Sequence, residues 1–120
     1  MPRPGAEPTD PIVLDTSAYS RLRTGHPEVL SLLARAPLVY LPVIVIGELA
    51  AAFEGGSRPL ENLTALAELI DEPFVHIIDV NQATARRYGQ LVGALRRAGT
   101  PIPTNDVWIA AIASGTDGHP

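Results

Sequence analysis

Three short apolar runs, separated by segments with helical signals, constrain the possible folds of this chain most strongly. The runs occupy residues 12–14, 38–41 and 74–78. A strand of a parallel sheet has this continuous apolar character, because helices cover both of its faces. The alternation of such strands with helices therefore predicts an α/β fold with a short parallel sheet flanked by helices.

The segments between the runs contain residues that favour helix boundaries. Pro27 and Pro59 suit the first turn of a helix, and Gly55 and Gly99 suit helix ends. After the first strand, Thr16 or Ser17 is suited to cap a helix, and Thr104 is suited to cap the last one. The later predicted helices span residues 27–36, 42–54, 57–72, 81–98 and 105–114, and the last of these is the one that follows Thr104.

The two ends of the chain differ from its middle. Residues 1–11 contain four prolines, which block regular structure, and residues 115–120 are short and polar. We therefore expect a flexible lead at 1–11, one domain at 12–114 and a polar tail at 115–120. No strand pattern follows the last helix.

Composition narrows the classes of function. The chain has 120 residues, 46% of them apolar, which suits one domain with a real core. The absence of cysteine excludes disulfides, a thiolate nucleophile and sulfur-based zinc sites. A net charge of −4 disfavours passive binding to nucleic acid, but it weighs less against a nuclease with a bound cation. Without a signal-peptide or membrane-span pattern, we expect a soluble cytoplasmic protein.

Glu48 is the acidic residue whose surroundings indicate function most strongly. It is the only charged residue between Arg35 and Glu54. A carboxylate on an apolar helix face needs a cation or strong hydrogen-bond donors to offset its desolvation, and an ion pair with an arginine is the structural alternative. Its predicted neighbours on that face are Ile44, Val45, Ala51 and Ala52.

Two further acidic residues, Asp15 and Asp106, stand at predicted element ends. Asp15 follows the first strand, where open parallel sheets form ligand sites, and it is equally suited to cap the next helix. Asp106 falls in the first turn of the last helix, where a carboxylate complements the helix dipole. Together with Glu48 they form a candidate metal site. Oxygen ligands suit Mg²⁺ or Mn²⁺, which activates water and neutralises charge on a phosphodiester.

Five short motifs follow one another along residues 12–113 in a specific order and spacing. They are Ile12-Val13-Leu14-Asp15-Thr16-Ser17, Pro42-Val43-Ile44-Val45-Ile46-Gly47-Glu48-Leu49, Tyr88-Gly89-Gln90-Leu91, Leu95-Arg96-Arg97-Ala98-Gly99 and Pro103-Thr104-Asn105-Asp106-Val107-Trp108-Ile109-Ala110-Ala111. With these motifs the sequence resembles the PIN-domain ribonucleases, specifically the VapC-type toxins of toxin–antitoxin modules.

The resemblance implies a PIN-like three-layer fold and a set of site residues. Asp15, Glu48 and Asp106 would bind Mg²⁺ or Mn²⁺, Thr104 would help to order the pocket, and Ser17 or Thr16 would contribute a hydroxyl. Family proteins cut RNA with this metal, commonly form homodimers and are silenced by an antitoxin whose tail fills the acidic groove. The resemblance therefore predicts a metal-dependent endoribonuclease toxin whose partners are RNA, a cognate antitoxin and a second copy.

The family pattern continues beyond the last helix with a strand, a fourth acidic position and usually a final strand. Residues 114–120 do not match this continuation, and Asp117 follows Asp106 by only 11 positions. We therefore expect a fold that lacks the C-terminal strands and leaves the first strand at a sheet edge. The alternative prediction is a truncated, weakly active or inactive PIN-like module that dimerises or binds an antitoxin.

For several other residues the sequence supports two interpretations of their role. Arg86, Arg87, Arg96 and Arg97 suit either RNA phosphates or a solvated helix face. Trp108 suits the core or a dimer contact better than base stacking. A phosphoryl-transfer enzyme with Asp15 as its nucleophile ranks last, since Ser17 stands where that class commonly has a second aspartate.

Overall fold

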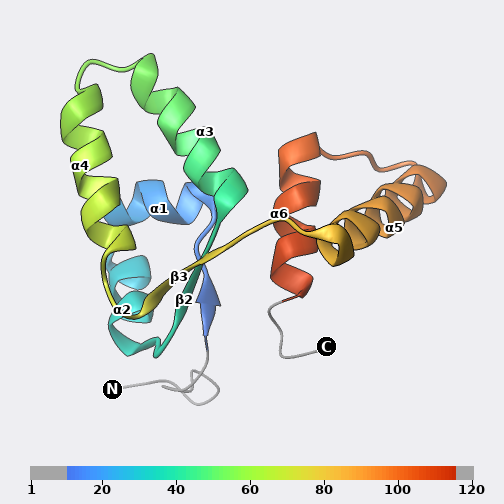
Figure 1. The fold of residues 1–120 in the computed structure, drawn as a ribbon, viewed down its shortest axis with the longest axis horizontal. Helices are drawn as coiled ribbons and strands as arrows, with labels where there is room; N and C mark the ends of the chain where they lie inside the picture. Colours follow the sequence, from blue (N-terminus) through green and yellow to red (C-terminus); the bar gives the residue numbers. More distant parts are fainter. Residues whose placement is uncertain (1–10, 116–120) are drawn as a thin grey trace.

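The computed structural model describes residues 11–115 as three strands and six helices (Figure 1). None of these helices is long and apolar enough to cross a membrane. Apart from residues 11 and 115, the predicted lead and tail lie outside the described residues, as does Asp117. The elements are β1 (Ile12–Val13), α1 (Thr16–Arg23), α2 (Pro27–Arg35), β2 (Val39–Pro42), α3 (Val43–Glu54), α4 (Pro59–Ile70), β3 (Val75–Ile78), α5 (Gln82–Ala98) and α6 (Thr104–Ser114).

The strands form a parallel sheet in the order β1-β2-β3. In the central strand, Val39 pairs with Ile12 on one side and with Val75 on the other. The predicted α/β class and the short parallel sheet flanked by helices are thus confirmed. β1 lies at an edge of this sheet, and residues 11–115 contain no strand after α6.

The boundaries of α5 follow directly from its sequence. Asn81 and Thr84 form a capping box, in which each side chain accepts a hydrogen bond from the backbone N–H of the other residue. Gly99 ends the helix with a φ of 69°, a left-handed conformation that glycine adopts without steric cost. The predicted helix over 81–98 is therefore confirmed almost to the residue.

The predicted boundaries of three helices are wrong. Pro42 belongs to β2, where it pairs with Ile78, so α3 begins one residue later. Helix α4 is two residues shorter at each end than the predicted 57–72. Thr104 is the first residue of α6 rather than its cap, because Pro103 holds the extended conformation at the capping position.

A buried core joins the sheet to α1, α3 and α4. Tyr19 of α1 is 2% exposed, and its hydroxyl has no hydrogen-bond partner among the described residues. Burial raises the pKa of this phenol, and the nearby charge of Arg23 partly offsets the shift. The core side chains are Leu14, Tyr19, Val39, Leu41, Val45, Leu49, Leu66 and Val75. We call residues 11–78, which contain this core, the body.

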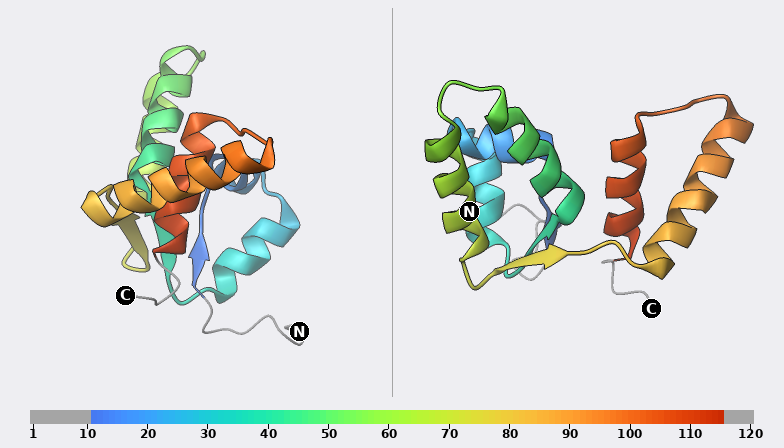
Figure 2. Two further views of the ribbon diagram at one scale, coloured as in Figure 1. Left: turned by 90° about the vertical axis from the view of Figure 1, so that its right-hand side faces the viewer. Right: turned by 45° about the horizontal axis from the view of Figure 1, so that its top comes forward.

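Helices α5 and α6 form a hairpin at the other side of the strands from α1, α2 and α4 (Figure 1). Two views place α6 between the body and α5 (Figures 1 and 2). Helix α6 contacts α3 and β2, whereas the main contacts of α5 are with α6. We call residues 82–114 the hairpin. It is attached to the body chiefly through α6.

Candidate functional site

An open cavity of about 380 Å³ lies where the start of α1, the middle of α3 and the start of α6 meet. Three carboxylates line it, those of Asp15, Glu48 and Asp106. Each comes from a different part of the chain, and the fold brings all three to one concavity. The rest of the lining consists of Thr16, Ser17, Ile109 and Ala110.

Asp15 reaches the cavity because it lies between β1 and α1, two residues after the end of the strand. Its Oδ1 accepts a hydrogen bond of 2.7 Å from the backbone N–H of Ala18, which caps α1. The residue that caps α1 is therefore Asp15, and not Thr16 or Ser17. A carboxylate has about four lone-pair sites and the cap uses one, so capping and metal binding are compatible.

Glu48 projects from α3 into the cavity and is half-buried. Its Oε1 accepts a hydrogen bond of 2.5 Å from the Thr16 hydroxyl, and its Oε2 accepts one of 3.2 Å from the Asn105 amide. Neutral donors from two other helices therefore hold both oxygens.

The surroundings of Glu48 differ from the prediction in two respects. Of its four predicted neighbours, Val45 is buried and Ile44 is half-buried, but Ala51 and Ala52 are exposed. The structural alternative, an ion pair with an arginine, is wrong within residues 11–115. The ion pair found there joins Arg58 to Glu61 at 3.6 Å on the surface.

Three successive residues in the first turn of α6 have side chains in different surroundings. Neighbouring residues of a helix are rotated by about 100° around its axis. Asp106 lines the cavity and Asn105 reaches Glu48, whereas Thr104 lines a separate groove beside Tyr88. The structure thus places the Asn105 amide, and not the Thr104 side chain, in hydrogen-bond contact with Glu48, and the role that the resemblance implied for Thr104 stays a prediction. The sequence offered only one signal for Asn105, its position next to Asp106.

The donor atoms around the cavity fit a hard divalent cation. They are carboxylate and hydroxyl oxygens, the donors that Mg²⁺ and Mn²⁺ prefer. In the described part of the chain, however, no three acidic or histidine side chains are close enough to hold one ion as they stand. Binding of one ion through all three carboxylates therefore requires them to move closer together.

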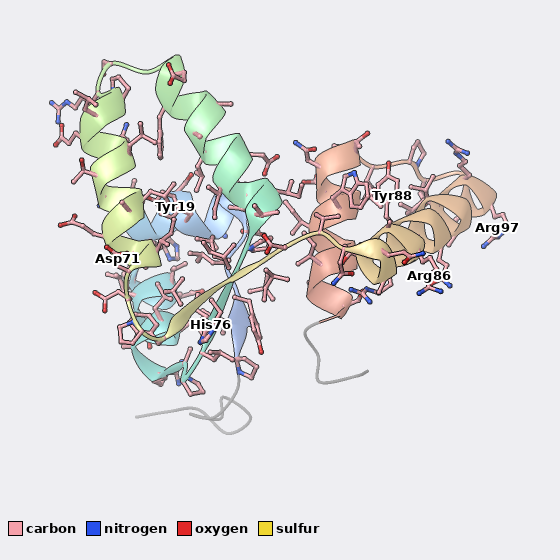
Figure 3. The ribbon with its side chains drawn as sticks, in the orientation of Figure 1. Tyr19, Asp71, His76, Arg86, Tyr88 and Arg97 are labelled. Carbon is pink, nitrogen blue, oxygen red and sulfur yellow. The ribbon has the colours of Figure 1, made fainter. Side chains whose placement is uncertain are left out.

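The arginines of α5 lie in different environments. The Arg87 Nε–H donates a hydrogen bond of 2.8 Å to the backbone carbonyl of Ala111, so Arg87 joins the two helices of the hairpin. Arg86 and Arg97 are exposed and project outward from α5 (Figure 3). The exposure of Arg86 and Arg97 agrees both with a solvated helix face and with binding to RNA phosphates.

Trp108 stacks on Tyr88, with ring centroids 3.9 Å apart and an interplanar angle of 11°. It is half-buried, and Figure 3 shows Tyr88 turned toward α6. An indole held face to face with a tyrosine inside the hairpin agrees with the predicted packing role.

The chain thus combines a parallel three-stranded sheet, flanking helices and three acidic side chains that line one cavity. The model of the PIN domain family matches residues 12–118. The chain belongs to the PIN domain family. This result confirms the resemblance read from the five motifs. No curated protein sequence matches this PIN domain.

Several solved structures are similar to this PIN domain. One is VapBC2 from Rickettsia felis bound to a DNA fragment from its promoter, with 26% identity and a TM-score of 0.73 over 87% of this chain and 80% of that one. Another is FitAcB from Neisseria gonorrhoeae, with 26% identity and a TM-score of 0.69 over 86% of this chain and 80% of that one.

A third match shows the fold alone. It is Mycobacterium tuberculosis VapC20, a toxin that cleaves the sarcin–ricin loop, with 18% identity. Its TM-score is 0.66 over 88% of this chain and 82% of that one.

Proposed function

We propose that this PIN domain protein is a metal-dependent endoribonuclease. The observation that carries the proposal is the convergence of Asp15, Glu48 and Asp106 on one open cavity from α1, α3 and α6. Three carboxylates that line one cavity offer a divalent cation charged oxygen ligands, and the bound ion would offset their mutual repulsion as they close around it. Divalent-metal use is general among PIN domain nucleases, and the choice of Mg²⁺ or Mn²⁺ is part of this proposal.

The residues in and around the cavity would have different roles in the reaction. Asp15, Glu48 and Asp106 hold the ion, while Thr16 and Asn105 orient the Glu48 carboxylate. When bound, the ion supplies an activated water and neutralises charge on the phosphodiester. The cavity is open to solvent, so a strand of RNA can approach it. Ser17 lines the same cavity and offers a hydroxyl to an RNA phosphate.

We also propose that the protein is the toxin of a toxin–antitoxin pair. The solved complexes VapBC2 and FitAcB, each 26% identical to this chain, support an antitoxin as partner. RNA as substrate and an antitoxin as inhibitor imply that the protein acts in the cytoplasm. The antitoxin would cover the acidic cavity, because occupying it blocks both the metal and the RNA.

A homodimer is a further part of the proposal. Seven large apolar side chains of the described residues are exposed, and packing of some of them against a second copy would remove apolar surface from water. Light scattering at increasing concentration tests this. A mass that stays at 12.7 kDa would contradict it. The exposed side chains are Leu30, Leu32, Leu60, Leu63, Ile77, Val80 and Ile102.

A second candidate function is an inactive or weakly active module that dimerises or binds an antitoxin. One observation favours it: within residues 11–115 the three carboxylates are not gathered tightly enough to hold one ion as they stand. Metal catalysis depends on positioning, and a displacement of roughly 1 Å costs on the order of a hundredfold in rate.

Cleavage of labelled single-stranded RNA distinguishes the two candidates. The wild type is compared with Asp15→Asn, Glu48→Gln and Asp106→Asn, each with Mg²⁺, Mn²⁺ or EDTA. Cleavage that requires metal and is lost in all three variants supports the nuclease. Equal cleavage by wild type and variants indicates a contaminant. No cleavage by any of them, with normal folding, supports the second candidate.

A further inference from the structure

We propose that Asn105 is a positioning residue that sets how tightly the cavity binds its divalent cation, an inference that rests on the proposed function. The Asn105 amide links the hairpin to the body at the acidic site. Its Nδ2–H donates to Glu48 Oε2 at 3.2 Å, across 57 positions of sequence. The residue next to it, Asp106, is the carboxylate that the hairpin contributes to the cavity.

The two donors to Glu48 have different structural consequences. Thr16 lies in α1, so its 2.5 Å hydrogen bond orients Glu48 relative to the body that already contains α3. Asn105 lies in the first turn of α6, so its hydrogen bond links Glu48 to the end of the helix that contributes Asp106. The separation of Glu48 and Asp106 at this contact decides whether the two share an ion.

The chemistry of the Asn105 side chain suits this role. A neutral amide donor orients the carboxylate and leaves its negative charge for the cation, whereas an arginine or lysine there would neutralise it. The two hydrogen bonds use one lone-pair site on each Glu48 oxygen, and the remaining sites can face an ion. Hydrogen bonds to ligating carboxylates typically contribute about tenfold to a hundredfold in metal affinity.

An aspartate at this position provides a variant with opposite effects in two conditions. Asn105→Asp keeps the size of the side chain but replaces a donor by a carboxylate beside Glu48. Without metal, the two like charges repel each other and the melting temperature should fall. With metal, the added carboxylate is a further ligand, so the metal-induced rise in melting temperature should exceed that of the wild type.

The test is a titration of the melting temperature with MnCl₂ and with MgCl₂. The proteins are the wild type, Asn105→Ala, Asn105→Asp and Asn105→Gln, with Asn62→Ala on α4 as the matched control. We fit the metal-induced stabilisation to RT ln(1 + [metal]/Kd) and expect Asn105→Ala to raise the fitted Kd by about tenfold or more. Asn105→Gln, which keeps the amide, should restore part of the affinity, and Asn62→Ala should match the wild type.

The possible failures are distinguishable. A wild type that responds to metal, with an unchanged Kd in Asn105→Ala and in Asn105→Asp, overturns the role of Asn105 and leaves the proposed function standing. Asp106→Asn is measured alongside, and a wild type that responds no more than this variant overturns the metal site and the role of Asn105 with it. Because each variant is compared with and without metal, a general loss of stability does not mimic a higher Kd.

Discussion

The body and the hairpin are stabilised in different ways. The body has a continuous core in which Leu41 and Val39 are 0% exposed. In the hairpin, α5 buries only Thr84 among its described side chains, and the two helices are joined by the Tyr88–Trp108 stack and the Arg87–Ala111 hydrogen bond. Helix α6 also buries Val107, Ala111 and Ile112, so the hairpin combines a small buried set with these specific contacts, while the body has the larger core.

The acidic cavity combines the two regions. Asp15 and Glu48 belong to the body, and Asp106 belongs to the hairpin. A change that loosens the hairpin should therefore damage the site while the body stays folded. A change in the body core should destroy both. Variants at four places test this difference in stabilisation. They follow in order from the largest expected effect on stability to the smallest.

The largest effect is expected at Leu41, in the central strand of the body. Leu41→Ala removes a fully buried side chain and should lower the free energy of unfolding by about 2–5 kcal/mol. Urea denaturation followed by circular dichroism measures this. The control is Leu60→Ala, at a leucine that is 80% exposed, where a change within about 0.5 kcal/mol is expected. Similar costs at the two leucines would contradict the assignment of the core to the body.

Arg87→Ala should produce the next largest effect, confined to the hairpin. It removes the donor to the Ala111 carbonyl, and a hydrogen bond from a charged group contributes about 1.5–3 kcal/mol. Hydrogen exchange should become faster in α5 and α6 and stay unchanged in β2. The neighbouring Arg86 is exposed, so Arg86→Ala is the matched control. Faster exchange in β2 as well would show that the two regions unfold together.

The stack between Tyr88 and Trp108 should contribute less. A double-mutant cycle with Tyr88→Ala and Trp108→Ala should give a coupling energy of about 0.5–1.5 kcal/mol, as aromatic pairs do. In a control cycle, Leu60→Ala combined with Trp108→Ala should be additive within about 0.5 kcal/mol. A coupling no larger than in this control would mean that the stack does not hold the hairpin together.

The smallest effect is expected in the body, and it has the opposite sign. The Tyr19 hydroxyl is buried without a partner among residues 11–115, so Tyr19→Phe should raise the free energy of unfolding by about 0–1 kcal/mol. A loss of stability at neutral pH would indicate that the hydroxyl has a partner.

Alkaline pH should increase the difference in stability between the wild type and Tyr19→Phe. The folded pKa of Tyr19 is raised by burial above the ordinary value of 10.0 that applies to the unfolded chain. The neutral phenol is thus favoured in the fold, and its contribution is complete below that value and is lost as pH rises through the folded pKa. The free energy of unfolding, measured with urea at several alkaline pH values, should therefore fall more steeply for the wild type than for Tyr19→Phe.

Much of the fold was predictable from local patterns. The three apolar runs correspond to the three strands. Helix α5 lies between Asn81 and Gly99, within one residue of the predicted range 81–98. These features depend on residues close in sequence, where steric and hydrogen-bonding preferences act directly. Pro42 was assigned to the wrong element, because its backbone angles suit both a strand end and a helix start.

The sequence by itself determined the α/β class, the strand positions, the motifs of the family and the three acidic residues. Only the tertiary structure decided that Asn105, and not Thr104, contacts Glu48, and that Arg87, and not Arg86, joins the two helices of the hairpin. In both pairs the choice is between adjacent helical positions, about 100° apart around the axis. Which of them faces the partner depends on how whole helices pack against each other, and that packing is a property of residues far apart in the chain.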